Sequence, residues 1–578
     1  MQTHLMTAPG ACARTSRTSR RPPWLVVAAV LSLAGCATAP PPPAPPPSSV
    51  SEAAAPVRLK LLAINDLHGN LKAPPGGIGI ADAANPMRLT QVPAGGVEAM
   101  ATLLDSLRAQ SPNHVFVAAG DLIGASPLLS SLFRDEPTIE ALNLMGMAVA
   151  AMGNHELDRG ATDLLRLQNG GCHPTDGCKG PQPFTGARFQ YLAANTVVLA
   201  SGKTLFPPYG VKTFEGIPVA FIGLTLKDTP RVLAPSGAAG LRFDDEADTV
   251  NALVPELQRQ GIEAIVVLMH EGGFSSGGYN ECPGISGPVV DIVKRLHKAV
   301  DLVISGHTHS AYNCVIDGRP VTSAHRFGTL VTQVDLVLDP VTRDVRSAKA
   351  ENVIVNTQTF APHPKLTELV ATYERLARPL AQRPITRLGA PFSVRTNAAG
   401  ESELGNLIAD AQLAATRDAG AQVALMNPGG VRAPLGGNGK LDVVFEDVFS
   451  VQPFYNLLVT FTLSGEQFMQ MLERSLSGSR LRALHHSHNL AYTFDAARPP
   501  GQRLLRDRVR LDGRPVTAEQ RVRITANSFI ADGGDDNSAL RQAADRQTGM
   551  LDVDALELYL KARPGLVPDP APRITRLN

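Results

Sequence analysis

Gly153-Asn154-His155-Glu156-Leu157-Asp158 is the stretch around which the rest of the chain is organised. It follows an apolar run, residues 148–152, that predicts a short buried strand. Working groups in α/β folds lie beyond the carboxyl ends of strands, and an amide, an imidazole and two acids are costly to place there without a ligand. A capped turn, in which Asn154 or Asp158 bonds local backbone, explains the segment equally well. Other stretches must decide between a ligand site and a turn.

Four further apolar runs end in polar residues in the same way. Residues 58–65, 115–119, 262–269 and 300–304 read as strands, and they alternate with longer amphipathic segments. This alternation is typical of an α/β domain. Together the five strand ends deliver one set of candidate ligands: Asp66, His68, Asp121, Asn154, His155, His270, His307 and His309.

These side chains suit a metal centre. Imidazole with carboxylate favours zinc, manganese or iron, and the lack of thiolate argues against a closed structural zinc site. One carboxylate can bridge two ions about 3.5–4 Å apart. A single histidine is more often a satisfied structural residue than a ligand, but convergence of five strand ends favours ligation.

The first 35 residues have the features of a signal peptide. Four arginines precede an apolar run, residues 24–33, that is too short to span a membrane. Leu33-Ala34-Gly35-Cys36 resembles a bacterial lipobox, which predicts lipidation of Cys36; a plain small-residue cleavage site is the alternative. Ala37 is not acidic, which in a Gram-negative cell would indicate the outer membrane. We therefore expect an exported, lipid-anchored protein.

A proline-rich stretch, residues 36–56, predicts an extended tether between the lipid and the folded body. The formal charge of the chain is +1, and without the four leader arginines it is −3, so no basic footprint for duplex nucleic acid is present. The body is too long for a single core, so at least two domains are expected. The oligomeric state stays open.

Besides Cys36, the exported part of the chain contains four cysteines. An even number outside the cytoplasm favours two disulfides, and Cys172–Cys178 with Cys282–Cys314 is the local pairing among the three possible ones. A cysteine-rich metal site is the alternative, although the spacing fits no zinc motif.

The C-terminal half offers groups that can bind a nucleoside. Residues 427–432 supply glycines for close backbone approach and Arg432 for an anion. Phe454 and Phe529 could sandwich a base, and Asp535 could hold a ribose, although core packing is the commoner role of a phenylalanine. His485, His486 and His488 form a triplet that we interpret as a surface loop.

These motifs, Asp66-x-His68, Gly120-Asp121, 153–156, His270 and Gly306-His307-x-His309, resemble those of the calcineurin-like metallophosphoesterases. The resemblance is to the branch of bacterial 5′-nucleotidases/UDP-sugar hydrolases and animal ecto-5′-nucleotidases, and it runs from about residue 57 to the C-terminus. It implies a four-layer α/β domain, two sheets sandwiched by helices, followed by an α+β substrate-binding domain. The implied organisation is a signal peptide 1–35, a tether 36–56, a metallophosphoesterase domain 57–360, a linker helix or hinge 361–384 and a 5′-nucleotidase C-terminal domain 385–578.

The resemblance also implies two divalent metal ions, zinc, manganese or similar. One would be held by Asp66, His68, Asp121 and His309, and the other by Asp121, Asn154, His270 and His307. A water between two cations has a lowered pKa and can attack phosphorus. His155 would stabilise phosphoryl oxygens or protonate the leaving group, oriented by Asp158. Some relatives have Gln at the position of His309, so the first ion's ligands and the metal preference can differ.

In the second domain the resemblance implies a nucleotide pocket. Phe454 and Phe529 would stack the base, while Asn427, Gly430, Arg432, Asn456 and Asp535 would contact phosphate, base or ribose. Arg395 corresponds to a substrate-binding arginine, although it lies further from the 401–410 motif than in relatives. Residues 364–377 carry apolar residues at helical spacing, which predicts a connecting helix. This helix could be a rigid spacer, whereas the resemblance implies a hinge about which the second domain rotates.

Three other functions stay open beside a 5′-nucleotidase. The first is a thiosulfohydrolase-type relative, which shares the two-domain frame. The second is a cyclic-nucleotide phosphodiesterase with nucleotidase side activity. The third is a surface-anchored binding protein without activity, against which the intact candidate ligands and the His155–Asp158 pair argue.

Overall fold

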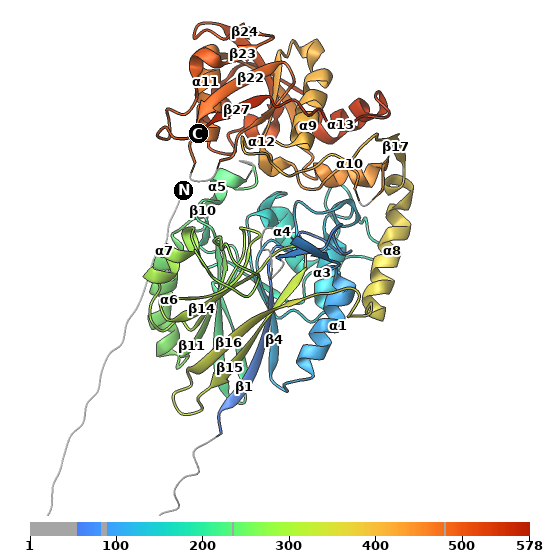
Figure 1. Cartoon of the computed structure of the whole chain (residues 1–578). Coiled ribbons are helices and arrows are strands. Elements are labelled where there is room, and N and C mark those ends of the chain that lie inside the picture. The colour runs from blue at the N-terminus through green and yellow to red at the C-terminus, as the bar shows by residue number, and fades with distance from the viewer. Residues whose placement is uncertain (1–54, 82–88, 234–235, 438, 479–480) are drawn as a thin grey trace, which may run out of the picture. The chain divides into compact units, whose positions relative to one another are not determined.

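The computed structural model describes residues 55–81, 89–233, 236–437, 439–478 and 481–578. The leader, Cys36 and nearly all of the tether lie outside the described residues. Figure 1 shows the order of the elements along the chain.

The N-terminal half is built on two six-stranded mixed sheets. Their inner faces bury one apolar cluster, which contains Leu61, Val117, Val219 and Val266, so the two sheets stack on each other. The first sheet has the order β16 (Val345–Ile354), β15 (Leu330–Leu338), β1 (Val57–Ile64), β4 (His114–Ala119), β5 (Val149–Ala151) and β6 (Gln190–Leu192). The second has the order β13 (Ala311–Ile316), β14 (Arg319–Ala324), β12 (Leu302–Ser305), β11 (Ala264–His270), β9 (Ile217–Thr225) and β8 (Tyr209–Phe214).

Helices cover the outer faces of both sheets, which completes four layers (Figure 1). The first sheet is covered by α1 (Val97–Arg108), α2 (Leu128–Ser131), α3 (Glu136–Leu144) and α4 (Gly160–Asn169). The second is covered by α6 (Glu246–Arg259) and α7 (Pro288–Arg295). Shorter elements are the hairpin of β2 (Ile78–Ala81) with β3 (Leu89–Val92), the pair β7 (Thr196–Val198) with β10 (Leu241–Phe243), and α5 (Thr229–Val232). The expected fold class is confirmed.

Parallel pairing places the candidate ligands at one edge. β1 pairs in parallel with β4, and β4 with β5, while β11 pairs in parallel with β12. The carboxyl ends of these strands therefore lie on the same side of each sheet, and the five strands expected from the sequence all end there.

The C-terminal half contains a five-stranded sheet and a four-stranded sheet. The first has the order β21 (His485–His486), β18 (Val423–Met426), β25 (Arg521–Asn527), β20 (Leu457–Ser464) and β26 (Ala544–Leu551). The second has the order β24 (Arg514–Pro515), β23 (Arg510–Leu511), β22 (Leu490–Asp495) and β27 (Ile574–Leu577). A two-stranded pair is β17 (Pro384–Arg387) with β19 (Asp442–Val444), and the helices are α9 (Glu403–Ala415), α10 (Phe445–Val451), α11 (Gly465–Leu476), α12 (Ser528–Ala531) and α13 (Asp552–Lys561).

The long helix α8 (Pro364–Ala381) joins the two halves. It buries Leu366, Val370 and Tyr373, and the Tyr373 ring lies 4.8 Å from that of Phe133 in an edge contact. The apolar cluster to which these residues belong continues into the C-terminal half through Phe449 and Leu556. From Ala54 onward the chain is accordingly one unit by its contacts, with α8 as part of a shared core.

The histidine triplet differs from the surface loop that we expected. His485 and His486 are buried in β21, which pairs with β18, and only His488 is exposed. The His485 ring fills the space beside Gly405 of α9, where a Cβ atom would lie 2.2 Å from it. Its Nδ1 accepts a bond from the Ser402 N–H. The prediction was wrong because these polar rings serve as packing groups under a helix.

No helix within the described residues combines the length and the apolar character needed to cross a membrane.

Candidate metal centre and adjoining pocket

Two clusters of candidate ligands form at the strand ends. Asp66, His68 and His309 make one cluster, and Asp121, His270 and His307 make the other; within each, one potential ligand atom per residue lies within 4.8 Å of the others. The Nε2 atoms of His68 and His309 face each other at 3.0 Å. The structure therefore brings together side chains separated by more than 240 residues in the sequence.

Asp121 lies between the clusters. Its Oδ2 is 3.0 Å from His270 Nε2 in its own cluster and 3.6 Å from His68 Nε2 in the other. Asn154 joins the second cluster, with its Oδ1 3.1 Å from His307 Nδ1. The seven residues that the sequence indicated as ligands therefore lie close together, with Asp121 between the two clusters.

The donor set fits divalent cations. His270 Nε2 is buried, and its nearest acceptor, Asp121 Oδ2 at 3.0 Å, is not in hydrogen-bond geometry, so among the described residues this nitrogen makes no hydrogen bond. A buried nitrogen left in this way is costly unless something else binds it. The opposite nitrogens of two rings are fixed by main-chain carbonyls: His270 Nδ1 by Ala119 at 2.8 Å and His68 Nδ1 by Gly124 at 2.9 Å. Such outer contacts set the tautomer that leaves Nε2 available to a metal.

The backbone at these strand ends is strained. Asp66, His68, Asp121, His307 and His309 all have φ between 46° and 68°, a region that residues other than glycine seldom adopt. Outliers of this kind gather where function over-determines the conformation.

Electrostatics link the acid and the imidazoles of the second cluster. Burial acts to raise the pKa of Asp121, but attraction to the imidazoles of His270 and His155 has the larger effect. The pKa of Asp121 therefore lies well below its usual range. Burial likewise disfavours protonated His270, but Asp121 outweighs it and raises the pKa of His270 to about 10. A cation bound here would displace that proton, so its affinity should rise with pH.

Glu156 ties the strand ends together. Its carboxylate accepts three main-chain N–H groups, from Asp121 at 2.9 Å, Leu122 at 2.8 Å and Gly153 at 2.7 Å. The group therefore fixes the loops after β4 and β5 relative to each other. Glu156 stands in the stretch that organises the sequence, but no motif or spacing there indicates this role.

His155 and Asp158 form the expected pair. His155 Nδ1 lies 2.9 Å from Asp158 Oδ1, and Asp158 Oδ2 accepts the Ala125 N–H at 3.0 Å. Burial works to lower the pKa of His155, but the carboxylates of Asp158 and Asp121 outweigh it, so this pKa lies above its usual value. A protonated imidazole with Nε2 left over is a potential proton donor.

A pocket of about 870 Å³ adjoins the second cluster and is lined by both halves of the chain. Its lining includes His155 and Asp158 together with seven of the eight candidate substrate residues: Asn427, Gly430, Arg432, Phe454, Asn456, Phe529 and Asp535. Arg395, the eighth, is exposed and does not line the pocket. Its neighbour Thr396 and the more distant Arg482 do line it. The turn at residues 397–401 follows Arg395, closed by a bond from Gly400 N–H to the Asn397 carbonyl.

Phe454 and Arg432 reach the metal centre from the C-terminal half. The Phe454 ring is stacked against that of His155 at 6.0 Å and 29°, and the Arg432 guanidinium carbon lies 5.7 Å from the Phe454 ring centre. Arg432 Nη2 is buried and finds no hydrogen-bond partner among the residues that the structure describes. An anion in this pocket would give that guanidinium its partner.

Neighbours that the sequence did not indicate hold other pocket residues. Asp552 bonds the Asn456 side chain, and burial raises the pKa of Asp552 to about 7. Phe529 packs so closely on Gly534 that a Cβ atom there would lie 2.5 Å from the ring. Asp535 donates its main-chain N–H to the Arg231 carbonyl of α5 at 3.0 Å. None of these contacts follows a periodic pattern in the sequence.

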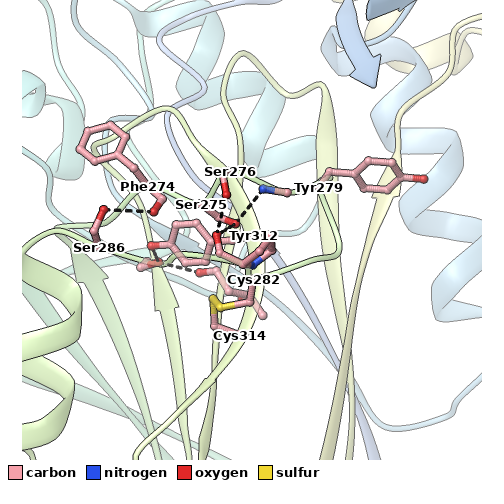
Figure 2. Close-up of a disulfide and its surroundings, with 12 residues drawn as sticks. Phe274, Ser275, Ser276, Tyr279, Cys282, Ser286, Tyr312 and Cys314 are labelled. Atoms are coloured by element: carbon pink, nitrogen blue, oxygen red, sulfur yellow. Dashed lines mark hydrogen bonds between the residues drawn. A yellow bond between two sulfur atoms is a disulfide. The ribbon is translucent and has the colours of Figure 1, made fainter. Parts of the chain in front are cut away.

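Both local disulfides are present. Cys172–Cys178 has a Cα–Cα distance of 4.6 Å, and Cys282–Cys314 one of 5.1 Å. Figure 2 shows the second below the loop that follows His270, beside Tyr312. Within that loop Phe274 and Ser286 exchange main-chain hydrogen bonds of 2.8 and 3.0 Å, and Phe274 lines the pocket. The disulfide therefore anchors to β13 a loop that begins at a candidate ligand and reaches the pocket.

Known proteins share this organisation. The family described as "Calcineurin-like phosphoesterase" matches residues 59–311, and that described as "5'-nucleotidase, C-terminal domain" matches residues 380–542. Two relatives are each 30% identical: Endonuclease YhcR of Bacillus subtilis, over 82% of this chain, and cell wall protein Lmo0130 of Listeria monocytogenes, over 85%. This chain spans 37% of the length of the first and 65% of the second.

A solved structure agrees. The 5'-nucleotidase precursor from Thermus thermophilus is 28% identical, with a TM-score of 0.75 over 90% of this chain and 99% of that one. The two matching families occupy the two halves that meet at the pocket. The chain belongs to the calcineurin-like phosphoesterases that carry a 5'-nucleotidase C-terminal domain.

Proposed function

We propose that the chain is a metal-dependent phosphohydrolase of the 5'-nucleotidase type, acting on nucleotides. The observation that carries this proposal is the stacking of Phe454 on His155. It places a potential base-binding ring beside the two ligand clusters, in one pocket. A nucleoside and its 5′-phosphate can then be held at the same time.

Two divalent cations would be held by the residues assigned above. Asp66, His68 and His309 would bind the first, Asn154, His270 and His307 the second, and Asp121 both. Such ions stabilise charge on phosphoryl oxygens and lower the pKa of water.

The chain's own groups would do the rest. Arg432 Nη1 donates to the Gly429 carbonyl at 3.4 Å, while Nη2 has no partner among the described residues and is offered to the phosphate. Asp158 holds His155 Nδ1, so that Nε2 carries the proton to the leaving oxygen. Phe454 and Phe529 would hold the base, and Asp535 the ribose. Binding energy from the nucleoside would thereby orient the phosphate.

The test compares AMP with a small aryl phosphate for wild type and Phe454→Ala. Phe454→Ala should raise the KM for AMP, because stacking of the base on this ring is worth about 1–3 kcal/mol. Hydrolysis of the aryl phosphate, which has no base, should be kept. Phe445→Ala is the control for loss of a buried phenylalanine in the same half. Equal loss on both substrates in Phe454→Ala would show that the ring only packs.

A phosphodiesterase is the second candidate, since one relative of 30% identity is named an endonuclease. Release of phosphate or nucleotide from 2′,3′-cyclic AMP faster than from AMP would favour it. The residues that line the pocket would serve both reactions, so the panel must include both esters.

We also propose that the protein is exported and anchored through lipidated Cys36. The two disulfides and the relative named a cell wall protein support export. Labelling of cells with a fatty-acid analogue should mark the wild-type protein and not Cys36→Ser. A labelled Cys36→Ser variant would contradict lipidation at this residue.

A further inference from the structure

Arg326 has an unusual position beside the first cluster. Its Nη1 lies 3.2 Å from His309 Nδ1, and within the described part of the chain the guanidinium makes no other hydrogen bond. Among the residues that the structure describes, no carboxylate lies within 4 Å of it. The guanidinium carbon also lies 4.8 Å from the centre of the Phe327 ring, and this cation–π contact offsets only part of the cost of burying a cation without an acid.

The backbone fixes this position. Residues 325–327 follow β14, and His325 and Phe327 both have positive φ, 61° and 58°. Asn65 Nδ2 donates to the His325 carbonyl at 2.8 Å, and Phe327 N–H donates to the Asp66 carbonyl at 2.7 Å. The segment is thus pinned to the strand end that supplies Asp66.

The contact with His309 conflicts with metal binding. Guanidinium nitrogens can only donate, so His309 Nδ1 must accept in this contact, and Nε2 then carries the hydrogen. Nε2 is, however, the atom that faces the cluster, 3.0 Å from His68 Nε2 and 3.3 Å from Asp66 Oδ1. A cation at this cluster would bind the Nε2 lone pair, so the ring hydrogen would have to be on Nδ1. The Nδ1–H of His309 and the Nη1–H of Arg326 would then point at each other as two donors.

The other rings show no such conflict. His68 and His270 turn their Nδ1 atoms to the carbonyls of Gly124 and Ala119, which can accept. Carbonyl and carboxylate partners of this kind strengthen ligation, typically about 10- to 100-fold. His309 alone meets a cation instead.

We propose that Arg326 makes the Asp66–His68–His309 cluster the weaker of the two cation sites and couples its occupancy to the phosphate. An ion at this cluster would release the guanidinium from His309, and a phosphate-like anion at the centre would then become its partner. Ion and anion binding strengthen each other by the same factor, as linkage requires. This inference rests on the proposed function in taking the two clusters as cation sites.

The test is calorimetric titration of chelator-treated protein with Mn²⁺, with and without methylphosphonate, a dianion that has no ester to cleave. Wild type should show a tight and a weak class of sites, with methylphosphonate tightening the weak one. His309→Ala should abolish the weak class and His270→Ala the tight one. Arg326→Gln should tighten the weak class about tenfold or more and reduce the effect of methylphosphonate.

Controls distinguish the outcomes. Retention of the tight class of sites shows that Arg326→Gln is folded. Arg326→Met, whose side chain has no N–H group, should tighten the weak class as Arg326→Gln does. Arg343→Gln removes the same charge from the turn between β15 and β16 and should change neither class. A weak class that Arg326→Gln and Arg326→Met leave unchanged or loosen would overturn the proposal, and wild type binding no ion would overturn the proposed function as well.

Discussion

Replacing Glu156 with glutamine tests how the metal centre is held together. Both Glu156 oxygens accept in the structure: Oε2 from the N–H groups of Asp121 and Gly153, and Oε1 from Leu122. Glutamine keeps one acceptor oxygen and turns an NH₂ group toward the remaining N–H. A hydrogen bond to a charged group is worth about 1.5–3 kcal/mol, which sets the scale of the loss.

The charge of Glu156 decides when this loss is felt. Burial, followed by the Asp121 carboxylate, raises the pKa of Glu156 from 4.5 to about 8. A group whose pKa is higher in the folded protein than in the unfolded chain stabilises the fold at pH values below its unfolded-state pKa. This stabilisation is lost as the pH rises through its folded-state pKa. In chelator, wild type and Glu156→Gln should therefore unfold at similar temperatures near pH 4.5, and the variant should become the more stable one as the pH approaches 8.

Cations reverse this order, because nearby positive charge favours the carboxylate anion. Only the anion accepts from all three N–H groups, so Glu156→Gln should bind Mn²⁺ about 10- to 150-fold more weakly, the factor equivalent to about 1.5–3 kcal/mol. Calorimetric unfolding in chelator and Mn²⁺ titration at pH 7.5 measure the two effects.

Glu473→Gln is the matched control. The Glu473 carboxylate accepts the main-chain N–H groups of Arg503 and Leu504 in the C-terminal half. Its loss should lower stability without changing Mn²⁺ affinity. Wild-type Mn²⁺ affinity in Glu156→Gln, or the same weakening in Glu473→Gln, would refute the reasoning.

Three other perturbations address the chemistry and the contact between the halves. His155→Ala should keep its Mn²⁺ while AMP turnover falls about 10²–10⁴-fold, and undiminished turnover would remove His155 from the reaction. Asp158→Asn removes a carboxylate that raises the pKa of His155, so the protonated ring is lost sooner and the basic limb of the kcat/KM profile should move to lower pH; a stationary limb would contradict this role. Arg231 and Asp536 form an exposed two-bond ion pair between the halves, at 2.6 and 2.9 Å. Arg231→Asp should therefore reduce AMP turnover by at most about fivefold, the equivalent of about 1 kcal/mol, with recovery in the Arg231→Asp/Asp536→Arg swap; a swap as impaired as the single variant would show that the ion pair has no part in this contact.

The candidate ligands could be located in the sequence because they follow five buried strands. A buried strand is recognisable from its apolar run, and the residue after it is then placed by the sheet. Asp66, Asp121, Asn154 and His307 could all be located by this logic. The fold class followed from the same alternation of strands and helices.

Contacts between distant segments could not be predicted in this way. Arg326 meets His309 only because residues 325–327 are pinned to β1, and nothing near Arg326 in the sequence indicates this. Glu156 is acidic like many capping residues, and its three bonds depend on the distance between β4 and β5. The burial of His485 depends equally on α9 packing over β21.

The most direct test of the central claim is AMP hydrolysis, measured while Mn²⁺ is returned to chelator-treated protein lacking residues 1–36. Phosphate release is expected to be absent in chelator, to reach its full rate when about two ions per chain are bound, and to stay absent in Asp121→Asn. Full release in chelator, or undiminished release by Asp121→Asn, would contradict a two-cation centre shared through Asp121.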